Sequence, residues 1–331
     1  MSARGTPAGS TEAPVGRLRH PSVLDVVLLV AINVLWAGSS APAKIALGSA
    51  GDVGRVGPFT LAFVRFAVAA GLFALTLAVL RHPVRVARAD VPRFLLAGFV
   101  GIAVTYGLFY HGVRASTAVE SGLLFAAQPV LIALLARVLL REVLTPGQAW
   151  GLALGFAGVY LIAVQGLVPR LSAAVVGNLI IGVAVAFESF ACIVCKGLTR
   201  RYAGVLVVFL QMLIGSLLLL PFAAAEIARY GPPVLSPSVI GSVAYLALVC
   251  SFLCFGIWFV LLPRLNVSLM AGFLFVQPIV SPIYAYVLLS ERLGWWSLGG
   301  GALVVAGVWL VAVRGVRRAG ESASRTQGNA W

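Results

Sequence analysis

Charged residues are scarce in this chain of 331 residues. They make up only 10% of it, and the only lysines are Lys44 and Lys196, whereas apolar residues make up 61%. A soluble protein of this length could not cover so much apolar surface with so few charges, so the composition predicts an integral membrane protein. Because the long apolar runs do not alternate in polarity, the spans are expected to be helices in an all-α membrane protein.

The chain also lacks the motifs of ATP-driven and enzymatic proteins. It contains no Walker-type loop, Gly-rich dinucleotide turn, HExxH motif or Ser/His/Asp set. Neither ATP drive nor covalent chemistry therefore has a basis in the sequence, and no cofactor is expected. The net charge of +14 does not predict a nucleic-acid partner, because the arginines lie in short loops and tails, where they orient a protein at an anionic membrane face.

Cysteine is rare as well. The four cysteines lie inside apolar runs as helical i,i+3 and i,i+4 pairs, Cys192 with Cys195 and Cys250 with Cys254. Four thiolates could bind a metal ion, but small packing residues are the favoured interpretation. We expect neither a metal site nor a disulfide framework.

Apolar runs divide the chain into ten predicted membrane spans. They are Val23–Leu47, Pro58–Leu80, Phe94–Val113, Ala118–Leu140, Gln148–Gln165, Val175–Cys195, Val205–Ala225, Ile240–Leu262, Leu269–Leu289 and Leu298–Val313. Residues 1–21 and 315–331 are polar and are expected to be disordered tails. The first run resembles a signal peptide, but we expect it to remain as the first helix, because its Trp36 and Lys44 fit the repeat described next.

The chain repeats itself. An offset of 149 residues, which we call the repeat offset, places Val119–Val164 on Ser268–Val313 without a gap, so that Gln128-Pro129 meets Gln277-Pro278 and Gly151 meets Gly300. This predicts two halves, residues 22–166 and 174–314, with five spans each. Because five is an odd number, the halves are expected to be inverted relative to each other, as in many secondary transporters.

The distribution of Lys and Arg supports this topology. Most of them fall in alternate loops, which by the positive-inside rule places both termini in the cytoplasm. The expected location is the cytoplasmic (inner) membrane of a bacterium. A GxxxG pattern at Gly151 and Gly155 predicts close helix packing, but the sequence leaves the oligomeric state open.

Several blocks of this sequence resemble the EamA-type permeases of the drug/metabolite transporter superfamily. They are Trp36-Ala37-Gly38 followed by Lys44, Arg65-Phe66, and the fourth-span block from Pro129 through Leu139-Leu140-Arg141-Glu142 to Gly158-Val159-Tyr160-Leu161, with its echo from Pro278 to Gly307-Val308-Trp309-Leu310. The resemblance implies a ten-helix bundle of two inverted five-helix repeats around a central substrate cavity. Similar proteins move amino acids and other small metabolites.

Glu188 is the first candidate functional residue. An offset of 152 residues places Trp36 on Glu188 and Lys44 on Lys196. An acid in the middle of a span costs about 2.5–3.5 kcal/mol on insertion scales, so its presence asks for a reason. It could bind a substrate amine or carry protons; the alternative is a protonated acid that hydrogen bonds to a neighbouring helix.

Polar and aromatic side chains near the middle of the spans are the other candidates for substrate binding. Gln128 and Gln277 each precede a proline, which interrupts helical hydrogen bonding next to a polar side chain. The aromatic candidates are Trp36, Tyr106, Tyr110, Trp258 and Tyr284. For each of these residues, packing in the core of the bundle is the alternative.

Four further residues are candidates for a gate or for proton coupling. Glu120 has no acidic counterpart in the repeat, and Arg65 or Arg114 could pair with it, either as an outer gate or as a structural ion pair. His111 is a candidate proton relay. Lys44 could guide an anionic group, or it could extend to the membrane interface. Glu142 and Glu291 are interpreted as helix caps.

Together these features predict a secondary carrier for a small organic metabolite, such as an amino acid, that works by alternating access. Export is favoured on family analogy alone. Glu188 is the candidate for coupling to protons. The expected partners are a small-molecule substrate and membrane lipid, without nucleic acid. A multidrug exporter is the main alternative, and a membrane-embedded enzyme or a scaffold is disfavoured because the acids lie at different depths and a soluble domain is missing.

Overall fold

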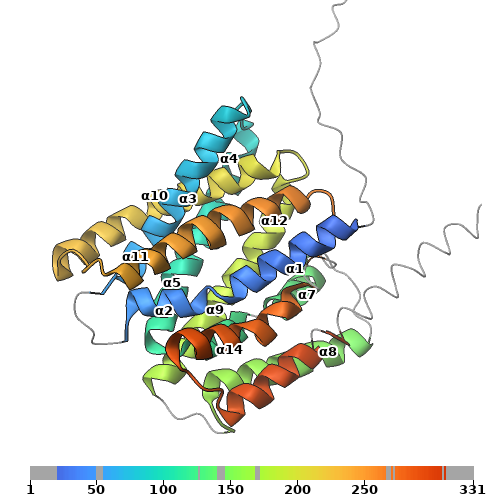
Figure 1. The fold of residues 1–331 in the computed structure, drawn as a ribbon. Helices are drawn as coiled ribbons and strands as arrows, with labels where there is room; N and C mark the ends of the chain where they lie inside the picture. Colours follow the sequence, from blue (N-terminus) through green and yellow to red (C-terminus); the bar gives the residue numbers. More distant parts are fainter. Residues whose placement is uncertain are drawn as a thin grey trace, which may run out of the picture.

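The computed structural model describes residues 21–49, 55–125, 127–139, 146–167, 172–265, 270, 273–307 and 309–310, and all regular structure in these ranges is helical (Figure 1). The first half contains α1 (Val23–Ala37), α2 (Ser40–Leu47), α3 (Pro58–Val79), η1 (Arg88–Asp90), α4 (Val91–Gly98), η2 (Phe99–Val104), α5 (Thr105–Ala115), α6 (Ala118–Phe125), α7 (Gln128–Leu139) and α8 (Pro146–Val164).

The second half follows the same order. It contains α9 (Ala173–Leu198), α10 (Gly204–Tyr230), α11 (Pro237–Ala244), η3 (Tyr245–Cys254), α12 (Phe255–Leu261), η4 (Phe273–Phe275), α14 (Val276–Leu289) and a last helix over residues 295–307.

Within the described ranges, six helical segments are long and apolar enough to cross a membrane. They are Val23–Leu47, Pro58–Val79, Arg88–Ala115, Ala173–Leu198, Gly204–Tyr230 and Pro237–Leu261. Ala118–Ile132, Ala149–Val164 and Val276–Leu289 are shorter apolar helices. The expected spans are therefore helical where the structure describes them, and the protein is an integral membrane protein.

The first expected span is not one continuous helix. It breaks at Gly38, which separates α1 from α2. A Cβ atom at Gly38 would lie 2.8 Å from the hydroxyl of Tyr245 and 3.0 Å from Cζ of Tyr284, so only glycine lets these two tyrosines approach the break. The sequence did not predict this interruption.

Other interruptions occur at equivalent places in the two halves. The third span contains the π-helical segment η2, and the repeat offset places it within the π-helical segment η3. π-helical segments are frequent at functional sites. In the fourth span α6 ends at Phe125 and α7 begins at Gln128, as expected for a helix interrupted before Pro129. In the other half the 3₁₀ turn η4 precedes Gln277.

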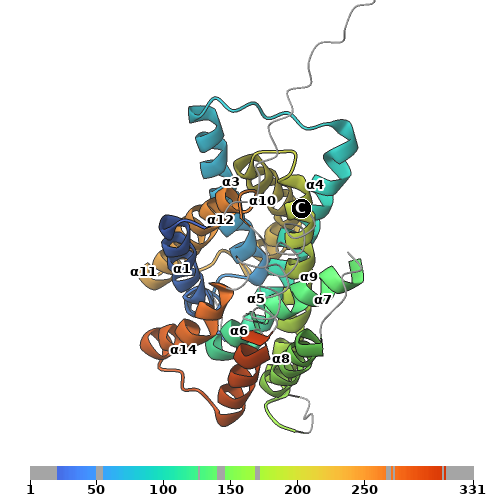
Figure 2. The same cartoon turned by 90° about the vertical axis from the view of Figure 1, so that its right-hand side faces the viewer.

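Equivalent spans of the two halves pack against each other. α3 packs along α10 and α6 along α14, and α8 lies beside the last helix in both views (Figures 1 and 2). A Cβ atom at Gly158 would collide with the carbonyl oxygen of Gly300, and one at Gly307 would collide with that of Gly151. The contacts therefore run in opposite orders along the two helices, which makes these helices antiparallel.

This close approach predicts the effect of adding one methyl group. Gly158→Ala should lower the free energy of unfolding by about 1–3 kcal/mol, because the backbone of the last helix leaves no room for the new atom. The change in stability is measured by thermal unfolding of the purified protein. Gly182→Ala is the matched control, since Gly182 lies within α9 with open space at its Cβ position. Equal melting temperatures for the two variants would contradict the prediction.

Candidate functional site

A cavity lies in the centre of the bundle, between helices of both halves. The space between its side chains has a volume of about 920 Å³, including the part that is open to solvent. Six of the eight residues predicted to bind substrate line this cavity, and so does Arg65. The six are Trp36, Tyr106, Gln128, Glu188, Trp258 and Gln277.

The cavity is built from equivalent positions of the two halves. Among its lining residues, the repeat offset pairs Tyr106 with Phe255, Phe109 with Trp258, Phe125 with Leu274, Gln128 with Gln277 and Ile132 with Ser281. The slightly longer offset that pairs Trp36 with Glu188 also pairs Ser40 with Cys192. Most pairs match in polarity, but the charged residues have no charged counterpart. A nearly symmetric scaffold thus carries an asymmetric set of charges.

Aromatic rings form the apolar wall of the cavity. The ring of Trp36 lies 5.2 Å from that of Phe255 and 5.7 Å from that of Trp258. Its Nε1 donates a hydrogen bond of 2.8 Å to the carbonyl oxygen of Cys250, within η3. This bond satisfies the polar atom of the indole and fixes its ring, so the aromatic surface is available to the apolar part of a ligand.

Arg65 is the cation of the cavity and is 2% exposed. Its Nε donates to Ser251 Oγ at 2.5 Å and its Nη1 to the hydroxyl of Tyr110 at 2.7 Å. The guanidinium carbon also lies 4.9 Å from the ring centres of Phe66 and Tyr106. Arginine can present a second edge of its planar group to a carboxylate while these contacts hold it in place.

Tyr110 was predicted to bind substrate directly, but the structure places it behind the cavity wall. Its side chain is fully buried and does not line the cavity. Tyr106 and Phe109, three residues apart on α5, line the cavity instead. The hydroxyl of Tyr110 points to Arg65. Tyr110 thus positions the guanidinium group.

Glu188 lines the cavity with a carboxylate oxygen, Oε2, that is buried and has no hydrogen-bond partner in the described part of the chain. Two other cavity-lining atoms share this property: Gln211 Oε1 and Ser281 Oγ. Buried polar atoms are almost always hydrogen-bonded in folded proteins. These three oxygens are thus free to accept hydrogen bonds from water or from a ligand in the cavity.

Gln211 and Ser281 were not among the site residues predicted from the sequence. Gln211 is the counterpart of Arg65, because α3 and α10 begin at Pro58 and Gly204 and each residue lies seven positions further on. Each side chain also contacts the π-helical segment of the other half. Arg65 bonds to Ser251 in η3. Gln211 Nε2 lies against Gly101 in η2, so close that a Cβ atom there would collide with it. Aligning the helix starts could have found Gln211.

Gln277 is held in a defined orientation. Its Nε2 donates to Asn33 Oδ1 at 2.9 Å, and Asn33 Nδ2 donates to the carbonyl oxygen of Leu29 at 2.8 Å. Asn33 is fully buried in α1, so this chain of bonds fixes which way the amide of Gln277 points. Tyr284, also predicted to bind substrate, lies at the break next to Gly38 and not at the cavity.

The two lysines have equivalent structural roles. Lys44 Nζ donates to the carbonyl oxygens of Val113 and Ser116 at 3.0 and 2.5 Å. Lys196 Nζ donates to those of Leu262 and Leu265 at 2.5 and 3.2 Å, which the repeat offset identifies as the same positions. Each lysine thus caps the end of the third span in its own half. The prediction that Lys44 acts as a gate is not supported by this geometry.

The remaining predicted gate residues lie outside the cavity. His111 is exposed, with Nδ1 2.7 Å from the carbonyl oxygen of Gly107 and its ring 4.7 Å from that of Phe59, so it is not a relay within the cavity. Glu120 bonds to Ser116 and Asn178, so Arg65 is not its partner. Glu291 accepts from the backbone N–H groups of α6, as expected for a cap. Glu142 lies outside the described residues.

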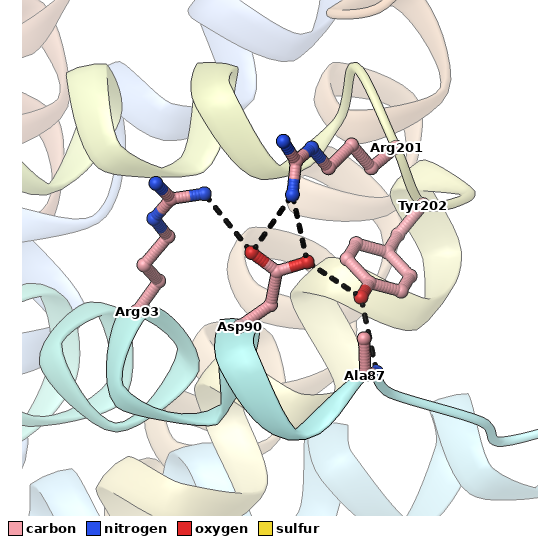
Figure 3. A network of polar contacts seen from close by, with 5 residues as sticks. All are labelled: Ala87, Asp90, Arg93, Arg201 and Tyr202. Carbon is pink, nitrogen blue, oxygen red and sulfur yellow. Dashed lines mark hydrogen bonds and ion pairs between the residues drawn. The ribbon is translucent and has the colours of Figure 1, made fainter.

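One end of the bundle carries a polar cluster that links the halves (Figure 3). Asp90, at the start of the third span, accepts from Arg93 at 2.9 Å, from Arg201 at 3.3 Å and from the hydroxyl of Tyr202 at 2.8 Å. Tyr202 in turn accepts from the backbone N–H of Ala87. The side chain of Asp90 is buried beneath the two arginines, so it connects the first half to the turn between α9 and α10.

Asp90→Asn should loosen this end of the bundle, because a neutral amide cannot hold two guanidinium groups. The arginines are largely exposed, so we expect only a severalfold rise in the fraction of molecules in which this end of the bundle has opened. The native Cys192 and Cys195, which line the cavity, should react faster with a small maleimide. Arg93→Gln, which removes a bond within one half, is the control. Equal labelling rates in Asp90→Asn and wild type would rule out this role.

An apolar helical bundle around a central cavity with both a cation and a carboxylate is typical of a membrane transport protein. Comparison with known families agrees, since residues 24–164 and 175–313 each match the EamA-like transporter family. The chain therefore belongs to this family, whose members are transporters and not enzymes.

Individual relatives span nearly the whole chain. A probable terminal-alkyne amino-acid exporter of Streptantibioticus cattleyicolor is 32% identical, over 89% of this chain and 96% of its own. An uncharacterized transporter of Archaeoglobus fulgidus is 24% identical, over 87% and 97%. A probable amino-acid metabolite efflux pump of Salmonella typhimurium is 29% identical, over 68% and 78%. A crystal structure of another protein shares the fold, with a TM-score of 0.62 at 19% identity, covering 89% of this chain and 99% of that one.

Proposed function

We propose that the protein is a secondary transporter that exports a small zwitterionic metabolite, an amino acid or a close relative, across the cytoplasmic membrane. The main support for this proposal is the asymmetric distribution of charge in the cavity. Arg65, already fixed by Ser251 and Tyr110, suits a substrate carboxylate. Glu188 Oε2 and Gln211 Oε1 are unsatisfied acceptors among the described residues, which suit the N–H donors of a primary ammonium group.

The apolar wall narrows the range of possible substrates further. Trp36, Phe255 and Trp258 surround the same space, so a substrate side chain that is aliphatic or aromatic gains from burial there. The named relatives from Streptantibioticus cattleyicolor and Salmonella typhimurium point to amino acids and their metabolites as well. Export is inferred from these names.

Alternating access between two inverted five-helix repeats is the proposed mechanism. The antiparallel packing of α8 with its counterpart, residues 295–307, supports an inverted relation between the halves. The breaks next to Gly38, Gln128 and Gln277 place interrupted helices around the site, as in other secondary transporters. The arginine-rich loops support the proposal that both termini are cytoplasmic and that there are ten spans. Glu188 is the proposed proton carrier.

Counterflow in proteoliposomes tests this proposal. Vesicles loaded with unlabelled L-phenylalanine or L-leucine should take up the labelled amino acid, while phenethylamine and phenylpropionate, each of which lacks one charged group, should compete weakly. Vesicles without protein are the control. If cationic dyes exchange and no zwitterion does, the protein is a drug exporter instead. Repeating the exchange with a pH gradient tests coupling: uptake by wild type that ignores the gradient would exclude Glu188 as a proton carrier.

A further inference from the structure

A groove on the side of the bundle is separate from the cavity. It runs between α3 of the first half and α11 with η3 of the second, and its volume is about 780 Å³, including the part that is open to the surroundings. Twelve described residues line it, and Thr60 is the only one of them with a polar side chain. We call it the lateral groove. Because its walls come from both halves, it borders the interface between them.

Small side chains leave this space between two segments that otherwise pack together. α3 packs against η3, but the lateral groove is lined by Val64 on α3 and by Ala244 and Ala247 on the other wall, which are too short to fill it. The hydroxyl of Thr60 donates to Glu226 Oε2 at 2.9 Å, so the polar atom of the lining is already satisfied. The lateral groove therefore offers apolar contacts, and water gains no hydrogen bonds by entering it.

The lateral groove opens to the hydrocarbon of the membrane. Three of its lining residues are partly exposed: Val68 at 42%, Ile240 at 52% and Leu248 at 46%. They lie within Pro58–Val79 and Pro237–Leu261, two of the segments that are long and apolar enough to cross a membrane. The apolar groups that surround the lateral groove in the membrane are therefore lipid acyl chains.

The length of the lateral groove suits one such chain. Its lining extends from Thr60 to Val68 along α3 and from Ile240 to Leu248 along the other wall, which is about 12 Å at 1.5 Å per residue. Val56 extends it beyond the start of α3. The hydrocarbon of one leaflet is about 15 Å deep, half of a core of about 30 Å. The lateral groove therefore matches the depth that an acyl chain of one leaflet crosses.

Cations lie at the end of the lateral groove where α3 and α11 begin. Arg55 directly precedes the lining residue Val56, is exposed, and donates one bond of 3.4 Å to the carbonyl oxygen of Ile45. That bond uses one of its five N–H donors, so the others can reach a phosphate. Arg229 lies in the last turn of α10, three residues after Glu226, which is bound to the start of α3. A phospholipid has the complementary arrangement, an anionic phosphate at the end of an apolar chain.

We propose that the lateral groove is a binding site for one acyl chain of a phospholipid, whose phosphate group binds to Arg55. Lipid on a convex helix surface touches one helix, whereas a chain in the lateral groove contacts α3 and α11 with η3 together. The protein should therefore bind one phospholipid more tightly than the rest. The site does not rest on the proposed substrate or on transport, and it can be tested without either.

Native mass spectrometry of the purified full-length protein, titrated with dioleoyl-phosphatidylglycerol, tests the site. In wild type the first lipid should bind on the order of tenfold more tightly than the second. In Ala244→Phe the new ring fills the lateral groove, so the first lipid should bind no more tightly than the second. Ala74→Phe is the matched control, because Ala74 is an exposed residue of α3 that does not line the groove. A first lipid that binds Ala244→Phe as tightly as wild type would overturn the proposal.

A change of lipid separates the acyl chain from the headgroup and does not depend on the folding of Ala244→Phe. Dihexanoyl-phosphatidylglycerol carries the same phosphate on chains too short to follow the groove, so wild type should bind it without a tight first site. Equal affinity for the two lipids would mean that the arginines bind the headgroup alone, and would overturn the proposal. Arg55→Gln should weaken binding of the first dioleoyl lipid about fivefold, because one cation near an anionic lipid is lost. Arg85→Gln, at an exposed arginine before η1, should leave it unchanged.

The same spectra detect the competing occupant, a second copy of this chain. A wild-type dimer that Ala244→Phe dissociates and Ala74→Phe does not would assign the lateral groove to protein contact and overturn the proposal. Monomers of wild type that retain one phospholipid through purification, and lose it in Ala244→Phe, would support the lipid site.

Discussion

Glu188→Gln is expected to lower the apparent affinity for amine-bearing substrates on the order of 100-fold, because a substrate ammonium loses its only described carboxylate partner in the cavity. Leaving a buried charge without its partner costs about 3 kcal/mol, and each 1.4 kcal/mol corresponds to a tenfold change. Glutamine has nearly the same shape, so the cavity should keep its volume. Competition in counterflow of labelled L-phenylalanine, measured as the half-inhibiting concentration, gives the affinity.

Selectivity separates this role from a merely structural one. Phenylpropionate lacks the ammonium group, so Glu188→Gln should bind it as well as wild type does while L-phenylalanine binding falls. Glu188→Asp keeps the charge and should recover part of the affinity. Glu226→Gln makes the same carboxyl-to-amide change at a helix cap outside the cavity and should leave the ratio between the two ligands unchanged. Parallel losses for both ligands in Glu188→Gln would count against an ammonium site.

The repeat was the part of the fold that the sequence predicted best. Glycine allows close packing of helices and proline interrupts a helix, so the positions of these residues predict backbone structure. Both kinds of residue recur at the repeat offset. Gly151 and Gly158 do pack against the helix that carries Gly300 and Gly307. The interruption before Gln128 was also found in advance.

The break between α1 and α2 was not predicted, because small residues in an apolar run are compatible with both a continuous and a broken helix. Only the approach of Tyr245 and Tyr284 from distant parts of the chain requires glycine at position 38. Long-range contacts of this kind leave no local signal.

Side-chain direction limited the prediction of the site. Tyr106 and Tyr110 are both compatible with one face of a helix, yet the cavity lies on the face of Tyr106 and Phe109, and Tyr110 turns to Arg65. The helical periodicity of a sequence identifies which residues share a face of a helix, but not which neighbouring helix packs against each turn of that face. Gln211 and Ser281 were missed because their interest lies in unsatisfied oxygens, which only a three-dimensional arrangement can reveal.

Arg65→Gln should produce the converse change in selectivity. It places in the first half the residue type that Gln211 already provides in the second, and it removes the described cation of the cavity. Affinity for L-phenylalanine should fall on the order of 100-fold, since about 3 kcal/mol of charge-assisted bonding to the carboxylate is lost. Phenethylamine, which lacks the carboxylate, should bind as it does to wild type. Arg65→Lys should restore little, because an ammonium group cannot bond to Ser251, Tyr110 and a carboxylate in the same planar arrangement.

Tyr110→Phe tests whether Arg65 must be held in place to act. The variant removes one hydrogen bond of 2.7 Å to the guanidinium group and leaves the cavity lining intact. Losing a hydrogen bond to a charged group costs about 1.5 kcal/mol, so affinity for L-phenylalanine should fall by roughly tenfold, less than in Arg65→Gln. Phenethylamine binding should not change, because Tyr110 acts only through Arg65. A loss shared by both ligands would mean that Tyr110 supports the fold of the cavity and not the position of its cation.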